Sequence, residues 1–340
     1  MKNVGKALII AGILSFCGAV FLGIGTNLLL QERKNGRNQT DTIYEEKQYT
    51  ASASEITTIK TNLASDDVQI EAWDGDDIEV IWKDEIDEPQ YQVSEHNGTL
   101  LIARKVTNTF VFFQIPDISI WETDNEDKKV TIKVPEEYAG RYDLGLSSGT
   151  LSVQDLNIKE ELSVDGTSGS VKLENLICEK DVTVEMTSGN VTMDTVETQG
   201  NMGLLLTSGN VKAADLVVNG DLDVDLTSGS GSIKTAEVAG TLSIDFTSGN
   251  FNIDELTVGE VYADITSGDI ALDTVTLEKG IYVSSTSGNA DVSLTDAMDN
   301  YEIKTDKTSG YCNLPDYFGN GDKYITVDIT SGSVEFSFGE

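Results

Sequence analysis

Apolar and polar positions repeat about every 20 residues through the second half of the chain, in register with a recurring Thr-Ser-Gly tripeptide. A Ser-Ser-Gly version ending at Gly149 comes first. The later units end at Gly169, Gly189, Gly209, Gly229, Gly249, Gly268, Gly288, Gly310 and Gly332. This regular spacing predicts a repeat architecture in which each unit contacts its neighbours.

The apolar residues of each unit keep a fixed distance from the glycine. They stand seven and five residues before it, as in Leu222 and Val224, and this period of two predicts a strand with one buried face. Beyond the glycine they stand two and four residues later, as in Phe251 and Ile253, which predicts a second strand after a corner. A shorter third segment ends at a turn such as Asn219-Gly220.

One such unit is too short for a helical repeat, and its strands cannot bury their apolar face alone. We therefore predict an all-β fold, a single-stranded β-solenoid (β-helix) of about ten coils of about 20 residues, each paired with the coils above and below. The glycine can adopt positive φ at the corner. The serine is expected to share the inward parity of the preceding strand and to satisfy backbone groups.

The residues assigned to these structural corners are Ser168, Gly169, Ser188, Gly189, Ser208, Gly209, Ser228, Gly229, Ser248, Gly249, Ser267, Gly268, Ser287 and Gly288. An alternative interpretation is that the stacked Thr and Ser hydroxyls form a ligand-binding ladder on an outer edge.

An outward position four residues before the glycine often carries an acid. These acids are Asp165, Glu185, Asp225, Asp245, Asp264, Asp306 and Asp328. Like charges on adjoining coils repel each other, and a hard cation such as calcium would relieve the repulsion. Asp225, Asp245 and Asp264 are therefore a candidate cation ladder. A solvated acidic face is the favoured alternative, because the glycine-rich calcium-binding nonapeptide of some β-helices is absent.

The remainder of the chain divides by composition. Residues 7–30 form an uncharged apolar run long enough to span a bilayer, after a short cytoplasmic tail at 1–6. Cys17 lies within this run, but Phe16 before it does not suit a lipoprotein site, so an uncleaved anchor is favoured. The polar residues 31–50 are expected to be a flexible stalk.

Two further domains follow the stalk. Residues 51–141 are predicted to form irregular β coils and an N-terminal cap, and 142–340 the regular repeats. The apolar segment Phe110–Pro116 is interpreted as a plug of the cap, or as a contact for a membrane or a partner. The charges on the two sides of the anchor do not decide its orientation. The composition of the body favours a β domain outside the cell.

Charge and residue usage exclude several classes of function. The chain has 23 Lys+Arg against 58 Asp+Glu and a formal net charge of −35, which repels nucleic acid and anionic lipid and would attract cations or basic partners. A single histidine, His96, argues against a histidine-based triad or zinc site. Cys178 and Cys312 stand at apolar repeat positions several coils apart, which predicts core residues that cannot form an intrachain disulfide. No catalytic residue and no cofactor is predicted.

The C-terminal repeat runs almost to the last residue. Val334, Phe336 and Phe338 alternate up to Glu340 without a polar cap. An uncovered last coil would present an open strand edge, so self-association through this edge is expected.

The repeat register, the VTIKVP segment followed by SSG within Val130–Gly149, and the N-terminal anchor together resemble a family of bacterial putative adhesins with β-strand repeats. This domain of unknown function is common in Gram-positive bacteria, and the resemblance covers about residues 50–340. It implies an envelope location and a part in adhesion or in the envelope stress response. It supplies no catalytic residues.

These observations favour a non-catalytic, membrane-anchored cell-surface protein that contacts a cell-wall polymer, a glycan or a protein surface. The alternatives are a self-assembling envelope scaffold and a stress-response component. A polysaccharide-acting enzyme is less favoured, because the outer acids are spread along the repeats without Lys or Arg beside them.

Overall fold

The computed structural model describes residues 44–105 and 129–340, and within these ranges the fold is all-β with one short 3-10 helix, η3 (Met298–Asn300). The strands are β1 Tyr44–Ala51, β2 Thr58–Trp73, β3 Ile78–Glu85, β4 Tyr91–His96, β5 Thr99–Arg104, β6 Lys129–Pro135, β7 Arg141–Ile158, β8 Leu162–Gly166, β9 Ser170–Cys178, β10 Val182–Met186, β11 Asn190–Thr198, β12 Met202–Val218, β13 Leu222–Ile265, β14 Asp269–Ser285, β15 Asn289–Leu294, β16 Tyr301–Lys307, β17 Tyr311–Cys312, β18 Tyr317–Phe318, β19 Lys323–Ile329 and β20 Ser333–Phe338.

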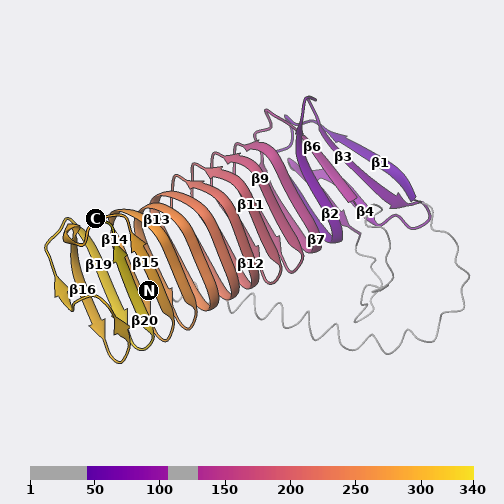
Figure 1. The fold of residues 1–340 in the computed structure, drawn as a ribbon. Coiled ribbons are helices and arrows are strands. Elements are labelled where there is room, and N and C mark those ends of the chain that lie inside the picture. Colours follow the sequence, from indigo (N-terminus) through magenta and orange to yellow (C-terminus); the bar gives the residue numbers. More distant parts are fainter. Residues whose placement is uncertain (1–43, 106–128) are drawn as a thin grey trace, which may run out of the picture. The chain divides into compact units, whose positions relative to one another are not determined.

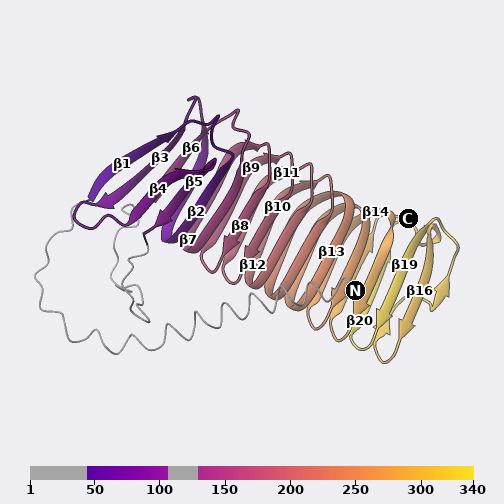
Figure 2. The ribbon, with the colours of Figure 1, turned by 180° about the vertical axis from the view of Figure 1, so that it is seen from behind.

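The regular part is a stack of parallel coils with a constant register. Val182 of β10 pairs with Leu162 of β8 on one side and with Met202 of β12 on the other, so each residue lies beside its equivalent 20 positions away. The same offset joins β7 to β9, β9 to β11 and β12 to β13. Figures 1 and 2 show these strands side by side in successive coils of the stack. The predicted stacking of one repeat on the next is confirmed.

Inward side chains from both strands of each coil fill one apolar core. Leu162 and Val164 before the corner and Val171 and Leu173 after it all have 0% exposure. The alternation read from the sequence therefore assigned the buried face correctly. Cys178 and Cys312 are buried free cysteines, as predicted, at 0% and 8% exposure.

Glycine is required at the corners for two reasons. Seven corner glycines have positive φ, between 96° at Gly149 and 135° at Gly209 and Gly229. In addition, a Cβ on Gly229 would lie 1.8 Å from the carbonyl oxygen of Gly209 in the preceding coil. Gly268, Gly288 and Gly310 lie outside the positive-φ region, and close contacts alone exclude a side chain there. The predicted corner conformation thus holds for most coils but not for these three.

At the N-terminal end the order of coils in space differs from their order in sequence. β2 pairs with β7 on one side and with β5 and β6 on the other, so the later strands β5 and β6 lie outside β2. Antiparallel β3 covers β6, antiparallel β4 covers β5, and β1 pairs with β3. Figure 2 labels β1 to β6 together at one end of the stack. Strand β1 occupies Tyr44–Ala51, so the predicted stalk at 31–50 does not extend through residue 50.

The C-terminal end shows the same reversal and corrects one expectation. Ile325 of β19 lies between Ile281 of β14 and Ile303 of β16, and β20 pairs with β15 and β17. The last coil in sequence is therefore inserted between two earlier ones. Antiparallel β18 pairs with β16 at the outer side. The strand that contains Val334 is not the open edge expected from its position in the chain.

A side chain continues the pairing where β17 ends. Asn313 Nδ2 donates to the carbonyl oxygen of Phe336 at 2.8 Å, and Asn313 Oδ1 accepts the backbone N–H of Phe336 at 2.9 Å. The amide group thus supplies both hydrogen bonds that a neighbouring strand would make with this residue. Because the edge of β20 is occupied at this point, it is protected from pairing with another chain.

Several sequence predictions fall outside the described residues. These are the anchor at 7–30 with Cys17, most of the stalk, and the apolar segment Phe110–Pro116. In the ranges that the structure describes, no helix has the length and apolar character needed to cross a membrane.

Candidate binding surface

Some serines of the corners form hydrogen bonds with the backbone of an adjoining coil. Ser168 Oγ donates to the carbonyl oxygen of Ser147 at 2.9 Å, and Ser309 Oγ donates to that of Thr330 at 2.8 Å. These contacts support the structural interpretation of the tripeptide. The serines do not share the inward parity that was expected, because the chain bends before the glycine. Ser168 is half-buried and Ser208 is exposed.

The acidic row lies on the outer face, as its parity predicted. Asp165 and Glu185 are direct partners on adjacent coils, whereas Leu205 interrupts the row on the next coil. Partial burial, reinforced by the charge of Asp143, raises the pKa of Asp165; partial burial, reinforced by Asp165, raises that of Glu185. Asp165 retains contact with solvent, so screening moderates this repulsion.

The candidate cation ladder stays a prediction. Asp264 Oδ1 accepts a hydrogen bond of 3.3 Å from Ser284 on the adjoining coil. Within residues 44–105 and 129–340, no three acidic, histidine or cysteine side chains converge in a way that could hold a metal ion. Asp225 and Asp245 both take part in interactions with other groups.

A tyrosine cluster lies beside this row on the last coils, and the sequence analysis did not single it out. Tyr262 and Tyr282 are direct partners in the pairing of β13 with β14. Their ring centroids are 6.1 Å apart with an interplanar angle of 40°. Tyr262 is 44% exposed, and Tyr282 is half-buried. Both residues stand six positions before a corner glycine, so a search of the outward repeat positions would have found them.

A third tyrosine, Tyr324, lies beside this cluster. Tyr324 of β19 pairs with Gly280, and a Cβ on Gly280 would contact the Tyr324 ring at 2.6 Å, so the ring lies over the glycine. Its hydroxyl donates a hydrogen bond to Glu260 Oε1. Burial, together with hydrogen bonds to Glu260 and Tyr262, raises the pKa of Tyr324 above its usual range. We call Tyr262, Tyr282 and Tyr324 with Glu260 and Asp264 the tyrosine platform.

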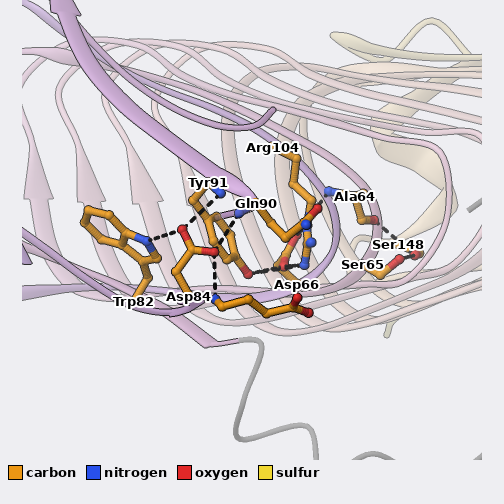
Figure 3. A network of polar contacts seen from close by, with 10 residues as sticks. Ala64, Ser65, Asp66, Trp82, Asp84, Gln90, Tyr91, Arg104 and Ser148 are labelled. Carbon is orange, nitrogen blue, oxygen red and sulfur yellow. Dashed lines mark hydrogen bonds and ion pairs between the residues drawn. The ribbon is translucent and has the colours of Figure 1, made fainter. Parts of the chain in front are cut away.

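A second polar cluster lies inside the N-terminal cap (Figure 3). Asp66 is fully buried, and its carboxylate receives two hydrogen bonds from the Arg104 guanidinium and one from the Tyr91 hydroxyl. The Arg104 guanidinium carbon lies 4.8 Å from the centre of the Tyr91 ring. Asp66 pairs with Gly149, so it occupies the corner position that glycine occupies in the later coils.

Asp84 is the other buried carboxylate in Figure 3. It is 2% exposed and accepts hydrogen bonds from the backbone N–H groups of Glu85, Gln90 and Tyr91, and from the indole of Trp82. Carboxylates that are buried and bonded in this way orient a loop and are not accessible to a substrate. The cap cluster therefore attaches β3, β4 and β5 to the first coils, and its role is structural.

Several solved structures are similar to this chain over most of its length. A "putative adhesin" from Parabacteroides distasonis is 14% identical, with 87% of this chain and 98% of that chain covered and a TM-score of 0.43. A "putative adhesin" from Bacteroides fragilis is 15% identical over 86% and 97%, with a TM-score of 0.37. A "putative lipid binding protein" from Parabacteroides distasonis is 19% identical over 87% and 97%, with a TM-score of 0.33.

No curated protein shows a significant match to this chain. The family model described as Toastrack DUF4097 matches residues 56–254 and again residues 220–337. These two ranges include nearly all of the stacked coils and most of the cap. The chain belongs to the Toastrack DUF4097 family.

Proposed function

We propose that this protein is a non-catalytic adhesin-type protein that binds another surface through the outer face of a β-solenoid. The observation that supports this is the constant register of the coils. Parallel pairing holds outward side chains such as Asp165 and Glu185 in straight rows. Rows on rigid strands form an extended, pre-organised contact surface, which lowers the entropic cost of binding a long partner.

The chemistry of the described residues is consistent with binding rather than catalysis. The two fully enclosed carboxylates, Asp66 and Asp84, are saturated by hydrogen bonds within the cap. The outer acids form short runs on adjacent coils, such as Asp165 and Glu185, and these runs are interrupted by groups such as Leu205 and Ser284. A polysaccharide-acting enzyme would need two carboxylates placed about a single bond, about 5 to 9.5 Å apart, and a way to bind the sugar between them.

We further propose that residues 7–30 hold the protein in the cell membrane with its β domain outside the cell. The uncharged run of this segment and the acidic, cysteine-poor body support this placement. Protease added to intact cells should then degrade the β domain. Deletion of residues 7–30 should release the protein from the membrane fraction; unchanged fractionation would contradict the anchor.

Binding is tested with the full-length protein purified in detergent micelles. We expect it to be retained by at least one of three surfaces: purified cell-wall sacculi, intact bacterial cells, or wells coated with host matrix proteins. An unrelated acidic membrane protein of similar net charge is the control for non-specific retention. Retention no greater than this control on all three surfaces would contradict the proposed function.

A further inference from the structure

We propose that the tyrosine platform is a glycan-binding site, and that its ligand is a chain of pyranose units without negative charge. The proposal rests on the proposed function, because it names the site and the ligand class of that surface. It starts from the place of the tyrosines in the repeat. The equivalent outward position holds Ser163, Thr183, Gly203, Asp223 and Ser243 in the earlier coils and changes to tyrosine at residues 262 and 282.

The exposed ring of Tyr262 and the half-buried ring of Tyr282 offer flat apolar surface on neighbouring coils. Their centroids are 6.1 Å apart and their planes are tilted by 40°, so they form a shallow, angled platform and not a single stacked pair. The face of a pyranose ring carries polarised C–H groups, which the negative face of an aromatic ring attracts. Tyrosine contributes this area at a low cost in conformational entropy, and it is enriched among the residues that dominate binding energy.

Hydrogen-bonding groups border the rings on both sides. Glu260 lies two residues before Tyr262 on the same strand, and the Tyr324 hydroxyl holds its carboxylate in place. On the other side Asp264 accepts a hydrogen bond from Ser284, which in turn is the register partner of Asp328. Carboxylates accept hydrogen bonds from hydroxyl groups, and serine and tyrosine both donate and accept them. A pyranose with apolar faces and a rim of hydroxyls matches this arrangement.

Charge restricts the ligand further. With a net charge of −35 and carboxylates on both sides of the rings, the platform repels anionic polymers. A basic peptide would be attracted by the acidic row as a whole, which already begins at Asp165, far from the tyrosines along the stack. Negative charge alone therefore does not account for tyrosine at this outward position in two coils, where the following coils carry Lys304 and Thr326. An uncharged sugar uses both the rings and the bordering acceptors.

The test is titration calorimetry of the full-length protein in detergent micelles with chitohexaose, cellohexaose and maltohexaose. Polygalacturonate is the anionic probe and poly-L-lysine the cationic one. We expect at least one neutral hexasaccharide to bind and polygalacturonate not to bind. Tyr282→Ala should weaken binding about tenfold or more, which is the usual cost of removing a central aromatic contact. Tyr282→Phe should retain most of the affinity, because the ring face remains.

Tyr311→Ala is the matched control. Tyr311 is 56% exposed but stands one residue after its corner glycine, outside the platform, so its removal should leave affinity unchanged. Circular dichroism confirms that each variant keeps the fold. The proposal is overturned if no neutral hexasaccharide binds, or if binding is insensitive to both Tyr262→Ala and Tyr282→Ala. Binding of poly-L-lysine alone, abolished by salt, would assign the surface to basic partners.

The same variants separate this inference from the proposed function. If the wild type is retained on sacculi, cells or matrix proteins and Tyr282→Ala is retained equally, the platform is not the contact site, while the proposed function stands. If the wild type is retained on none of these surfaces and binds no hexasaccharide, both proposals fail.

Discussion

The central coils and the two ends of the stack differ in the strands with which their backbones pair. In the centre each strand pairs with its equivalent one repeat away, and identical contacts recur along the chain. At the ends the partners are distant in sequence: Thr58 pairs with Arg141, and Ser333 pairs with Asn289, 44 residues earlier. The centre is therefore held by repetition, whereas each end depends on a few specific polar groups.

The comparison explains how the stack avoids exposed edges. A strand at the end of a sheet presents unpaired backbone groups that invite pairing with other chains. At one end β3 and β4 cover the outer strands β6 and β5, the Arg104–Asp66 ion pair joins β5 to β2, and the Tyr91 hydroxyl joins β4 to the same carboxylate. At the other end β18 and Asn313 occupy the outer backbone groups of the last coils. Different residues thus protect the two ends in the same way.

The largest effect is expected from breaking the repetition of the centre. Gly229→Val adds a branched side chain at φ 135°, where a Cβ would already lie 1.8 Å from the carbonyl oxygen of Gly209. We expect the free energy of unfolding to fall by about 4–5 kcal/mol, or cooperative unfolding to disappear altogether. The reason is that the substitution combines backbone strain with a backbone clash. Urea unfolding followed by circular dichroism measures it.

The matched control for this corner is Ser230→Val, which places the same side chain on the exposed neighbouring residue. Ser230→Val should change the free energy of unfolding by no more than about 0.5 kcal/mol. Equal losses for the two variants would show that the corner glycine has no special role.

A smaller loss is expected from the N-terminal end. Arg104→Ala leaves the fully buried Asp66 carboxylate without its cation, and breaking a buried pair in this way costs about 3–5 kcal/mol. Lys60→Ala is the control, because the Lys60–Asp143 pair is partly exposed and should contribute at most about 1 kcal/mol. Urea unfolding of the single variants and of Arg104→Ala/Asp66→Ala measures the coupling, and a coupling near zero would contradict the assignment.

The C-terminal end should be sensitive to one amide. Asn313→Ala leaves the N–H and C=O groups of Phe336 without their partner, with an expected cost of about 1–3 kcal/mol. It also reopens the edge of β20, so concentration-dependent association in light scattering should increase. Asn252→Ala, which removes a surface hydrogen bond to Asp254, is the control. An unchanged association state would mean that other groups protect this edge.

The smallest expected effects are changes in stability with pH, which have opposite signs at the C-terminal end and in the centre of the stack. A hydrogen bond from Lys323 lowers the pKa of Asp296 near the C-terminal end, so its stabilisation is present above the unfolded value, about 3.9, and is lost as pH falls through the folded value. Burial raises the pKa of Glu185 in the centre, so its ionisation opposes folding at neutral pH, and this penalty disappears on acidification.

Asp296→Asn should therefore destabilise the protein at pH 7, and Glu185→Gln should stabilise it slightly. At pH 3 the difference for Glu185→Gln should be gone, whereas that for Asp296→Asn should only shrink, because the folded pKa of Asp296 lies below its usual value. Urea midpoints at pH 7 and pH 3 measure this. Midpoint shifts of the same sign for the two variants at pH 7 would contradict the proposed electrostatic difference between centre and end.

Much of the centre was predictable because its information is local and repeated. The position of Val164 relative to Gly169 predicts which face of the strand is buried. Because the same pattern recurs in each unit, it also predicts that equivalent strands stack on one another. The tyrosine platform was predictable in part: Tyr262 and Tyr282 share one repeat position, but Tyr324 precedes its glycine by a different number of residues. Only the fold shows that its hydroxyl reaches Glu260.

The sequence by itself determined the all-β class, the inward residues, the glycine corners and the outward row of acids. Tertiary structure alone decided the order of the end coils, the burial of Asp66 against Arg104, and the closure of β20 by Asn313. The physical reason is the range of the contacts. A repeat encodes its own partner 20 residues away, whereas an end has no such neighbour and must be completed by residues from distant parts of the chain.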